Sequence, residues 1–209
     1  MAEYVTDSSE ESPDLNDEGT SSEDESTDEE FEYDVPARIQ NYVEKDILID
    51  ESSPLHMAAQ KGPRKYLEVM LDNGCSPNSI NQYGNSLLLL SCMSGQIRGV
   101  RMLIERGADV NHVNRYGNTV LHMAAMNGHV KVIDLMVSQH NININKTNFS
   151  GSTPLHFACV MGRYNAIKRL VELGADVKVK NVTGSTPLHA ASLNGYGQMM
   201  EQLVNKGGD

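Results

Sequence analysis

From about residue 50 onwards, apolar residues recur with the spacing of one helix face, in short segments that end at glycines. One segment shows the pattern clearly, because Leu155, Ala158 and Cys159 share a face and Gly162 then breaks the helix. A second helix is predicted over 164–172, where apolar residues follow at i, i+3 and i+4. We therefore expect short helix pairs, and one such pair is too small to bury its own apolar faces.

Residues 1–35 lack this pattern and are rich in Ser, Thr, Asp and Glu. Few apolar side chains are available there to offset the entropy of ordering, and the like charges repel one another. This segment is predicted to be an acidic, disordered N-terminal arm. Residues 36–49 are predicted to hold a capping helix and a linker, because Ile39, Tyr42 and Val43 fall on one side of a helix.

The charge of the chain is divided between the arm and the remainder. The formal net charge is −11, yet 15 of the 28 Asp and Glu residues lie in residues 1–34, where Lys and Arg are absent. The other 13 acids stand against 17 Lys and Arg, a net charge of +4. This asymmetry suggests two tasks, or one task with an electrostatic assistant.

The arm is also a candidate for phosphorylation, because several of its hydroxyl residues have an acid three residues further on, the pattern that acidophilic kinases favour. The candidate positions are Ser8, Ser21, Ser22, Ser26 and Thr27. Each phosphate would add roughly 1.5 to 2 negative charges. A plain solubilising tail is the alternative interpretation of the same composition.

A short motif recurs at a fixed period in the remainder of the chain. Five similar segments begin at steps of 33, 33, 34 and 33 residues, at Ser53, Ser86, Thr119, Thr153 and Thr186. Three of them read Thr/Ser-Pro-Leu-His. A second marker, Gly107-Ala-Asp-Val-Asn111 in its fullest form, keeps the same phase. This two-part motif resembles the ankyrin repeat.

The resemblance covers residues 50–209 and implies an all-α solenoid of helix–turn–helix pairs with β-hairpin fingers. Five repeats are expected near 50–81, 82–114, 115–148, 149–181 and 182–209. Repeat two departs from the motif, since Leu87 and Leu89 replace its proline and histidine.

The sequence offers little support for catalysis or for a bound cofactor or metal. It contains no phosphate-binding loop, no His-Glu-x-x-His and no Cys-x-x-Cys. The resemblance makes four of the seven histidines structural, namely the motif residues His56, His122, His156 and His189. Cys92 and Cys159 occupy small-residue positions and are expected to be buried. We therefore predict that the chain is not an enzyme and needs no cofactor.

Two rows of variable positions are candidates for binding a protein. The inner ladder lies four residues after each motif histidine position and comprises Gln60, Met93, Met126, Val160 and Leu193, with Met161 beside it. The finger row lies next to the finger glycines and comprises Tyr83, Arg115, Tyr116 and Phe149. Exposed apolar and aromatic side chains are typical of interfaces. The alternatives are that neighbouring helices cover the ladder and that the rings lie flat on adjacent fingers.

Three functions follow as hypotheses. The first is an intracellular adaptor or regulator, cytoplasmic or nuclear and monomeric, that binds a protein partner through the concave surface. The second is a chaperone of a basic nucleic-acid-binding client, with the arm as a competitor for nucleic acid. The third is a degradable inhibitor similar to the inhibitors of NF-kappa-B, because Asp7-Ser8-Ser9-Glu10-Glu11-Ser12 resembles their signal except at Ser9. Direct nucleic-acid binding is disfavoured by the scattered cations, and no segment suggests a membrane.

Overall fold

The computed structural model describes residues 54–193 and residue 195. The predicted arm, its candidate phosphorylation sites and the predicted capping helix over 36–49 lie outside the described residues. The same holds for the chain beyond residue 195 and for the side chain of Leu193.

Helices in two parallel rows make up this part of the chain. The first helices of the repeats are α2 (Pro54–Lys61), α4 (Leu87–Met93), α6 (Val120–Asn127), α8 (Pro154–Val160) and α10 (Pro187–Leu193). The second helices are α3 (Arg64–Asp72), α5 (Ile97–Glu105), α7 (Val130–His140) and α9 (Tyr164–Glu172). The helix-pair architecture predicted from the repeat is confirmed.

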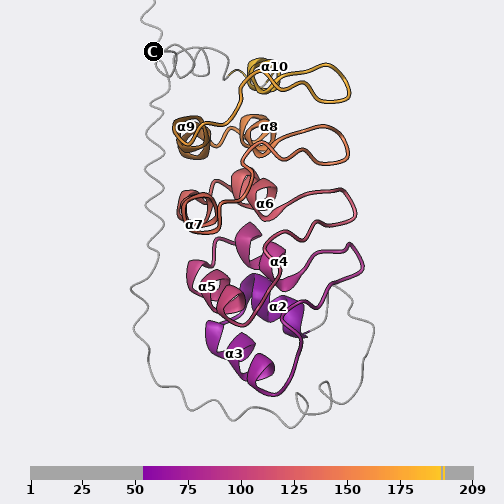
Figure 1. The fold of residues 1–209 in the computed structure, drawn as a ribbon, viewed down its shortest axis with the longest axis vertical. Coiled ribbons are helices and arrows are strands. Elements are labelled where there is room, and N and C mark those ends of the chain that lie inside the picture. Colours follow the sequence, from indigo (N-terminus) through magenta and orange to yellow (C-terminus); the bar gives the residue numbers. More distant parts are fainter. Residues whose placement is uncertain (1–53, 194, 196–209) are drawn as a thin grey trace, which may run out of the picture. The chain divides into compact units, whose positions relative to one another are not determined.

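Each repeat packs on the next, so the core runs along the stack. The first helices contact one another in order from α2 to α10, and the second helices contact one another from α3 to α9. Figure 1 shows the two rows side by side, with the loops that follow the second helices projecting beyond the first-helix row. These loops are the fingers. The ladder and the finger row therefore belong to the side of the stack opposite the second helices.

The motif residues explain why the first helices begin where they do. In repeat four, Thr153 is the N-cap of α8 and Pro154 occupies the first helical position, where the missing N–H is not needed. The Thr153 N–H donates to His156 Nδ1 at 3.1 Å. Behind this cap, Leu155, Ala158 and Cys159 are fully buried, as the apolar pattern predicted.

Repeat two reaches the same helix without the Pro and His of the motif. Its residues Leu87, Leu88, Leu89 and Leu90 are all buried. The Ser86 hydroxyl caps α4 by accepting from the Leu89 N–H at 3.3 Å, and Ser91 Oγ donates to the Ala59 carbonyl at 2.9 Å. The run of leucines thus forms the middle of the core between α2 and α6.

The fingers are hairpin turns rather than paired strands. Among the described residues, β pairing is limited to an isolated bridge between Ile80 and Ser86. An asparagine begins each turn, and its N–H closes the hairpin by donating to the carbonyl four residues on, as from Asn114 to Asn118 at 3.1 Å. The predicted hairpin geometry is present, but it is too short to form strands.

Candidate protein-binding surface

The inner ladder is more exposed at its C-terminal end than at its centre. Val160 and Met161, at the end of α8, are each 49% exposed. Met93 and Met126 are half-buried and pack against the core. Neighbouring residues therefore partly cover the middle of the ladder, at Met93 and Met126. Val160 and Met161, in contrast, present apolar surface to solvent.

A series of hydrogen bonds from the next repeat holds the ladder in register. The backbone carbonyls of Gln60, Met93 and Met126 each accept a side-chain hydrogen bond from the residue that follows the next loop glycine. The three donor atoms are Gln96 Nε2 at 2.9 Å, His129 Nε2 at 3.0 Å and Arg163 Nε at 3.1 Å. Sequence reasoning missed these residues. Their shared position after Gly95, Gly128 and Gly162 was the available signal.

The finger row contains three exposed aromatic side chains. Tyr83 is 37% exposed, Tyr116 60% and Phe149 73%. Two further residues with the same character, Ile80 and Val182, were not predicted, although Val182 is 74% exposed. Val182 occupies the position of Phe149 in the next finger, 33 residues on.

The side chains of the finger row rest on the preceding finger without being covered by it. A Cβ atom placed on Gly117 would lie 2.7 Å from Phe149 Cδ1, so the ring sits over that glycine. The Arg115 stem lies against Gly84 in the same way, with Cγ 3.1 Å from such a position. Phe149 is therefore seated on its neighbour and still mostly exposed, so contact with the adjacent finger does not remove the ring from solvent.

Asparagines fix the geometry of these tips. The Asn148 Oδ1 atom accepts from the N–H groups of Ser150 and Ser152, both at 3.0 Å. Its Nδ2 donates to Asn118 Oδ1 of the preceding finger at 2.8 Å, and the Phe149 N–H donates to the Tyr116 carbonyl at 3.1 Å. Because each finger is bonded to its neighbour, the exposed side chains are presented on a rigid scaffold.

Two of the motif histidines, His122 and His156, connect their helices to fingers. His122 Nε2 lies 2.9 Å from the Ser152 carbonyl, and His156 Nε2 lies 3.0 Å from the Ser185 carbonyl. A carbonyl can only accept, so Nε2 carries the proton and Nδ1 accepts from the cap threonine. Burial lowers the pKa of His122 to about 4, and the hydrogen bond to Ser152 opposes the shift. Within the described residues, no three His, Cys, Asp or Glu side chains converge as metal ligands would.

The cysteines do not form a reactive site. Cys92 and Cys159 are fully buried, and burial raises the pKa of both thiols. Burial also raises the pKa of the half-buried Cys75 thiol. A raised pKa keeps a thiol protonated and a weak nucleophile, so these residues act in packing.

The repeat architecture has a counterpart among known families. The family model of ankyrin repeats matches residues 34–114, 106–181 and 148–209. The chain therefore belongs to the ankyrin repeat family, whose repeats form protein–protein interaction modules and are generally non-catalytic. A search of curated proteins finds no match to the chain. Among the described residues, no helix is long and apolar enough to cross a bilayer.

Proposed function

We propose that the chain is a non-catalytic adaptor or regulator that binds a protein partner through the finger row and the exposed end of the inner ladder. The observation that carries this proposal is the exposure of Phe149 and Val182 on adjacent fingers, each nearly three quarters accessible. Such side chains are costly to leave in water and are preferred anchors of interfaces.

The scaffold under these residues favours binding without rearrangement. Tyr116, Phe149 and Val182 stand on turns joined by backbone hydrogen bonds, and the ladder is held by the donors at Gln96, His129 and Arg163. A surface that is already ordered loses little conformational entropy on binding. Arg115, beside Tyr116 and exposed, adds a charged contact at the edge of the surface.

The test is a matched pair of aromatic truncations. Phe149→Ala removes the most exposed ring of the finger row, and Tyr164→Ala removes an exposed ring from the second-helix row. Partners captured from lysate by the full chain would be identified and their affinities measured with purified proteins. We expect Phe149→Ala to weaken binding by about tenfold or more, the effect of a hot-spot residue. Unchanged affinity in Phe149→Ala, or an equal loss in Tyr164→Ala, would contradict the proposal.

The acidic arm supports a second candidate, a chaperone of a basic nucleic-acid-binding client. Fifteen acids within residues 1–34 would attract such a client at long range, and this attraction weakens as salt rises. The full chain and a chain beginning at Val35 would be used as baits at low and moderate salt. Basic partners that disappear with the arm or with salt would favour the chaperone. Identical partners on both baits would leave recognition with the repeats.

A further inference from the structure

Equivalent residues of three successive fingers form what we call the tip line. Its members are Arg115, Phe149 and Val182, each four residues before the threonine that begins the next repeat motif. Their backbone N–H groups donate to a carbonyl of the preceding finger, at 3.1, 3.1 and 3.0 Å. The tip line therefore presents a cation, an aromatic ring and an aliphatic side chain in that order along the stack, and all three are exposed.

Contacts with the preceding finger hold the tip line in register. Arg115 and Phe149 lie over the glycine of the preceding finger, with side-chain carbons 3.1 and 2.7 Å from a Cβ atom placed on that glycine. The Val182 backbone nitrogen lies 3.1 Å from the same position on Gly151. Because all three residues are seated in the same way, the fold fixes the order in which a partner meets them.

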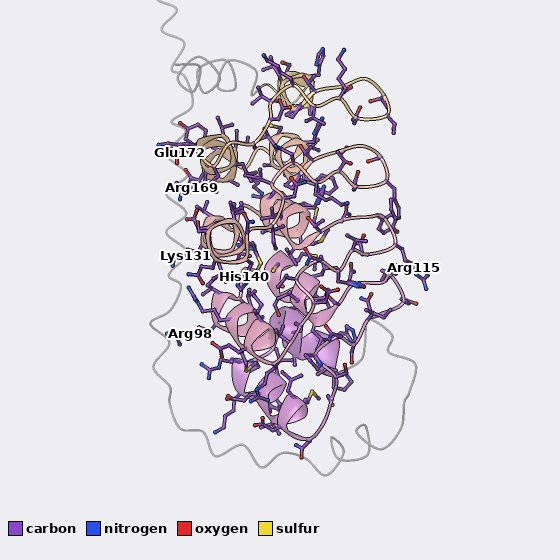
Figure 2. The ribbon with its side chains drawn as sticks, in the orientation of Figure 1. Arg98, Arg115, Lys131, His140, Arg169 and Glu172 are labelled. Atoms are coloured by element: carbon purple, nitrogen blue, oxygen red, sulfur yellow. The ribbon has the colours of Figure 1, made fainter. Side chains whose placement is uncertain are left out.

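Exposed cations accompany the apolar tips. Arg115 begins the tip line, Lys180 stands two residues before Val182, and Lys146 belongs to the finger of Phe149. All three cationic side chains are exposed, and among the described residues none of them forms an ion pair or a side-chain hydrogen bond. Figure 2 shows Arg115 at a finger tip, on the opposite side of the stack from the residues labelled on the second helices.

The acids of the finger loops make local hydrogen bonds. Asp109 Oδ1 accepts from the Asn111 N–H at 2.9 Å, and Asp176 Oδ1 accepts from the Lys178 N–H at 2.8 Å. Each acid stands six residues before a member of the tip line, at the start of its finger. The four finger loops hold four Lys and Arg against two Asp and Glu, a local charge of +2, over residues 74–86, 107–119, 141–153 and 174–186.

We propose that the tip line and the cations beside it bind a segment of a partner protein in which adjacent apolar side chains stand between acids. This inference rests on the proposed function and names the chemistry of the partner. The apolar side chains of the segment cover Phe149 and Val182. Its acids face Arg115 at one end of the tip line and Lys180 at the other. A few buried apolar anchors carry most of the affinity of an interface, and charges at its rim set orientation and exclude partners of the wrong sign.

The order of the side chains favours a peptide over a nucleic acid. A single strand binds along a cationic track, with aromatic side chains on which successive bases stack. In the tip line, the cation is followed by one ring and then by Val182, which offers no stacking surface. The formal charge of −11 on the whole chain also repels a polyanion more strongly than a peptide with few acids.

The first experiment compares three capped, fluorescent peptides on the full chain. The acid-flanked probe is Glu-Asp-Leu-Phe-Leu-Asp-Glu. The neutral probe has Gln and Asn in place of its acids, and the polar probe has three serines in place of Leu-Phe-Leu. Anisotropy titrations at low and physiological ionic strength give the affinities. Because the whole chain carries −11, long-range attraction does not favour an acidic probe, and an advantage of the acid-flanked probe reports the local cations.

The expected result follows from the two parts of the surface. At low ionic strength, we expect the acid-flanked probe to bind roughly fivefold or more tightly than either control. Its advantage over the neutral probe is expected to shrink as salt rises, since exposed charges are screened.

Charge reversals then locate the contacts with the acids. Arg115→Glu and Lys180→Glu change the two ends of the surface, whereas Lys168→Glu makes the same change of net charge on an exposed residue of α9. An exposed ion pair contributes up to about fivefold in affinity. We therefore expect each finger reversal to weaken the acid-flanked probe by roughly threefold to fivefold, and Lys168→Glu by less than about twofold. The neutral probe is expected to change little in all three variants, and circular dichroism checks their fold.

Phe149→Ala separates this inference from the proposed function. If Phe149→Ala weakens the acid-flanked and neutral probes while the charge reversals weaken neither, the surface binds protein without selecting acids, and only this inference is wrong. If the reversals weaken binding and Phe149→Ala does not, the proposed function is contradicted as well.

The remaining outcomes also overturn the inference. These are equal affinities for the acid-flanked and neutral probes, equal losses in Arg115→Glu and Lys168→Glu, and absence of binding by the acid-flanked probe at low ionic strength. Tighter binding of a single-stranded oligonucleotide of equal charge would assign the surface to nucleic acid instead.

Discussion

The first helix of repeat two begins with a run of leucines, whereas the first helix of repeat four begins with Thr153-Pro-Leu-His156. Both helices have seven residues, of which six are buried in α4 and five in α8. In repeat four, the His156 ring bonds to the cap residue and to the Ser185 carbonyl of the next finger. In repeat two, Leu89 takes that position and contributes apolar burial alone.

The comparison separates two ways of joining a helix to its neighbours. The histidine gives directional hydrogen bonds, which set the position of the next finger but depend on the protonation of the ring. The leucine gives a larger apolar contact, which is insensitive to pH and to the orientation of the finger. The repeat motif therefore serves finger geometry more than helix formation, since the helix forms without it.

The largest expected effect comes from truncating the leucine. Leu89→Ala removes a side chain that is only 1% exposed, and we expect the free energy of unfolding to fall by about 3 kcal/mol, from lost burial and the cavity left behind. Because the chain has no tryptophan, urea unfolding would be followed by circular dichroism.

A restored motif sharpens this result. Leu89→His places an imidazole where its equivalents in repeats three and four donate to a finger carbonyl, and here the equivalent acceptor is the Asn118 carbonyl. We expect Leu89→His to lose less stability than Leu89→Ala. An equal loss would mean that the finger after repeat two is not positioned to accept this bond.

Acidification tests the histidine side of the comparison. Burial lowers the pKa of His56 and His122 to about 4 in the folded chain, below the value of about 6.5 expected when unfolded. The unfolded chain then binds more protons between these values, so stability is complete above about pH 6.5 and falls as the pH decreases towards 4. Integrating this difference, we expect a loss of roughly 2 kcal/mol per buried histidine between pH 7 and pH 5.

The control for the pH series uses an exposed histidine. His122→Gln is expected to flatten the dependence of the unfolding free energy on pH, although it also lowers stability at pH 7. His189→Gln, in which the replaced ring is exposed, is expected to preserve the wild-type slope. A slope that His122→Gln leaves unchanged would show that other groups govern the acid sensitivity.

A smaller effect is expected at the finger glycines. Gly117 has φ +77°, and an added Cβ would lie 2.8 Å from the Phe149 backbone nitrogen. Gly184 occupies the same place in the last finger with φ +79°, but nothing lies within 4 Å of its added Cβ. We expect Gly184→Ala to cost about 1 kcal/mol, from backbone strain alone. We expect Gly117→Ala to cost about 2 kcal/mol, because its new Cβ atom also collides with Phe149. Thermal unfolding of the two variants gives the difference, and equal melting temperatures would contradict the packing of Phe149 on Gly117.

The smallest effect concerns the cap hydroxyls. Thr153→Val removes the hydroxyl that lies 2.9 Å from His156 Nδ1, and we expect a loss of about 1 kcal/mol in unfolding free energy. Ser86→Ala removes a hydroxyl that accepts from the Leu89 N–H at 3.3 Å but has no histidine partner, and it is expected to cost less. The reverse order in chemical denaturation would show that the leucine helix depends more on its cap than the histidine helix does.

The architecture could be predicted from the sequence because the same motif occurs in five successive repeats. A glycine, a cap residue and an apolar stripe recur in phase, so a degraded copy such as Ser86-Leu-Leu-Leu89 is still recognised by its place in the series. The candidate surface was harder to predict. The positions of Met93 and Met126 are variable in composition, but their burial depends on contacts across repeats that no single repeat encodes.

The residues that sequence reasoning missed share a physical reason. Val182 and Ile80 are exposed at hairpin turns, where no periodicity distinguishes an inward side chain from an outward one. Gln96, His129 and Arg163 act through one common contact, a donor reaching the preceding carbonyl. Because three different residue types make this contact, comparing the amino acids at equivalent positions of the repeats did not reveal it.

The missing histidine at Leu89 also has a mechanical consequence. Between repeats three and four, a pull along the stack would load both the Arg163 bond to Met126 and the His122 bond to Ser152. Between repeats two and three the motif bond is absent, and the joint is held by the His129 bond to Met93 and by the Arg115 N–H, which donates to the Tyr83 carbonyl at 3.1 Å. The stiffness of the stack is therefore uneven, and we expect the joint between repeats two and three to bend more readily than the joint between repeats three and four.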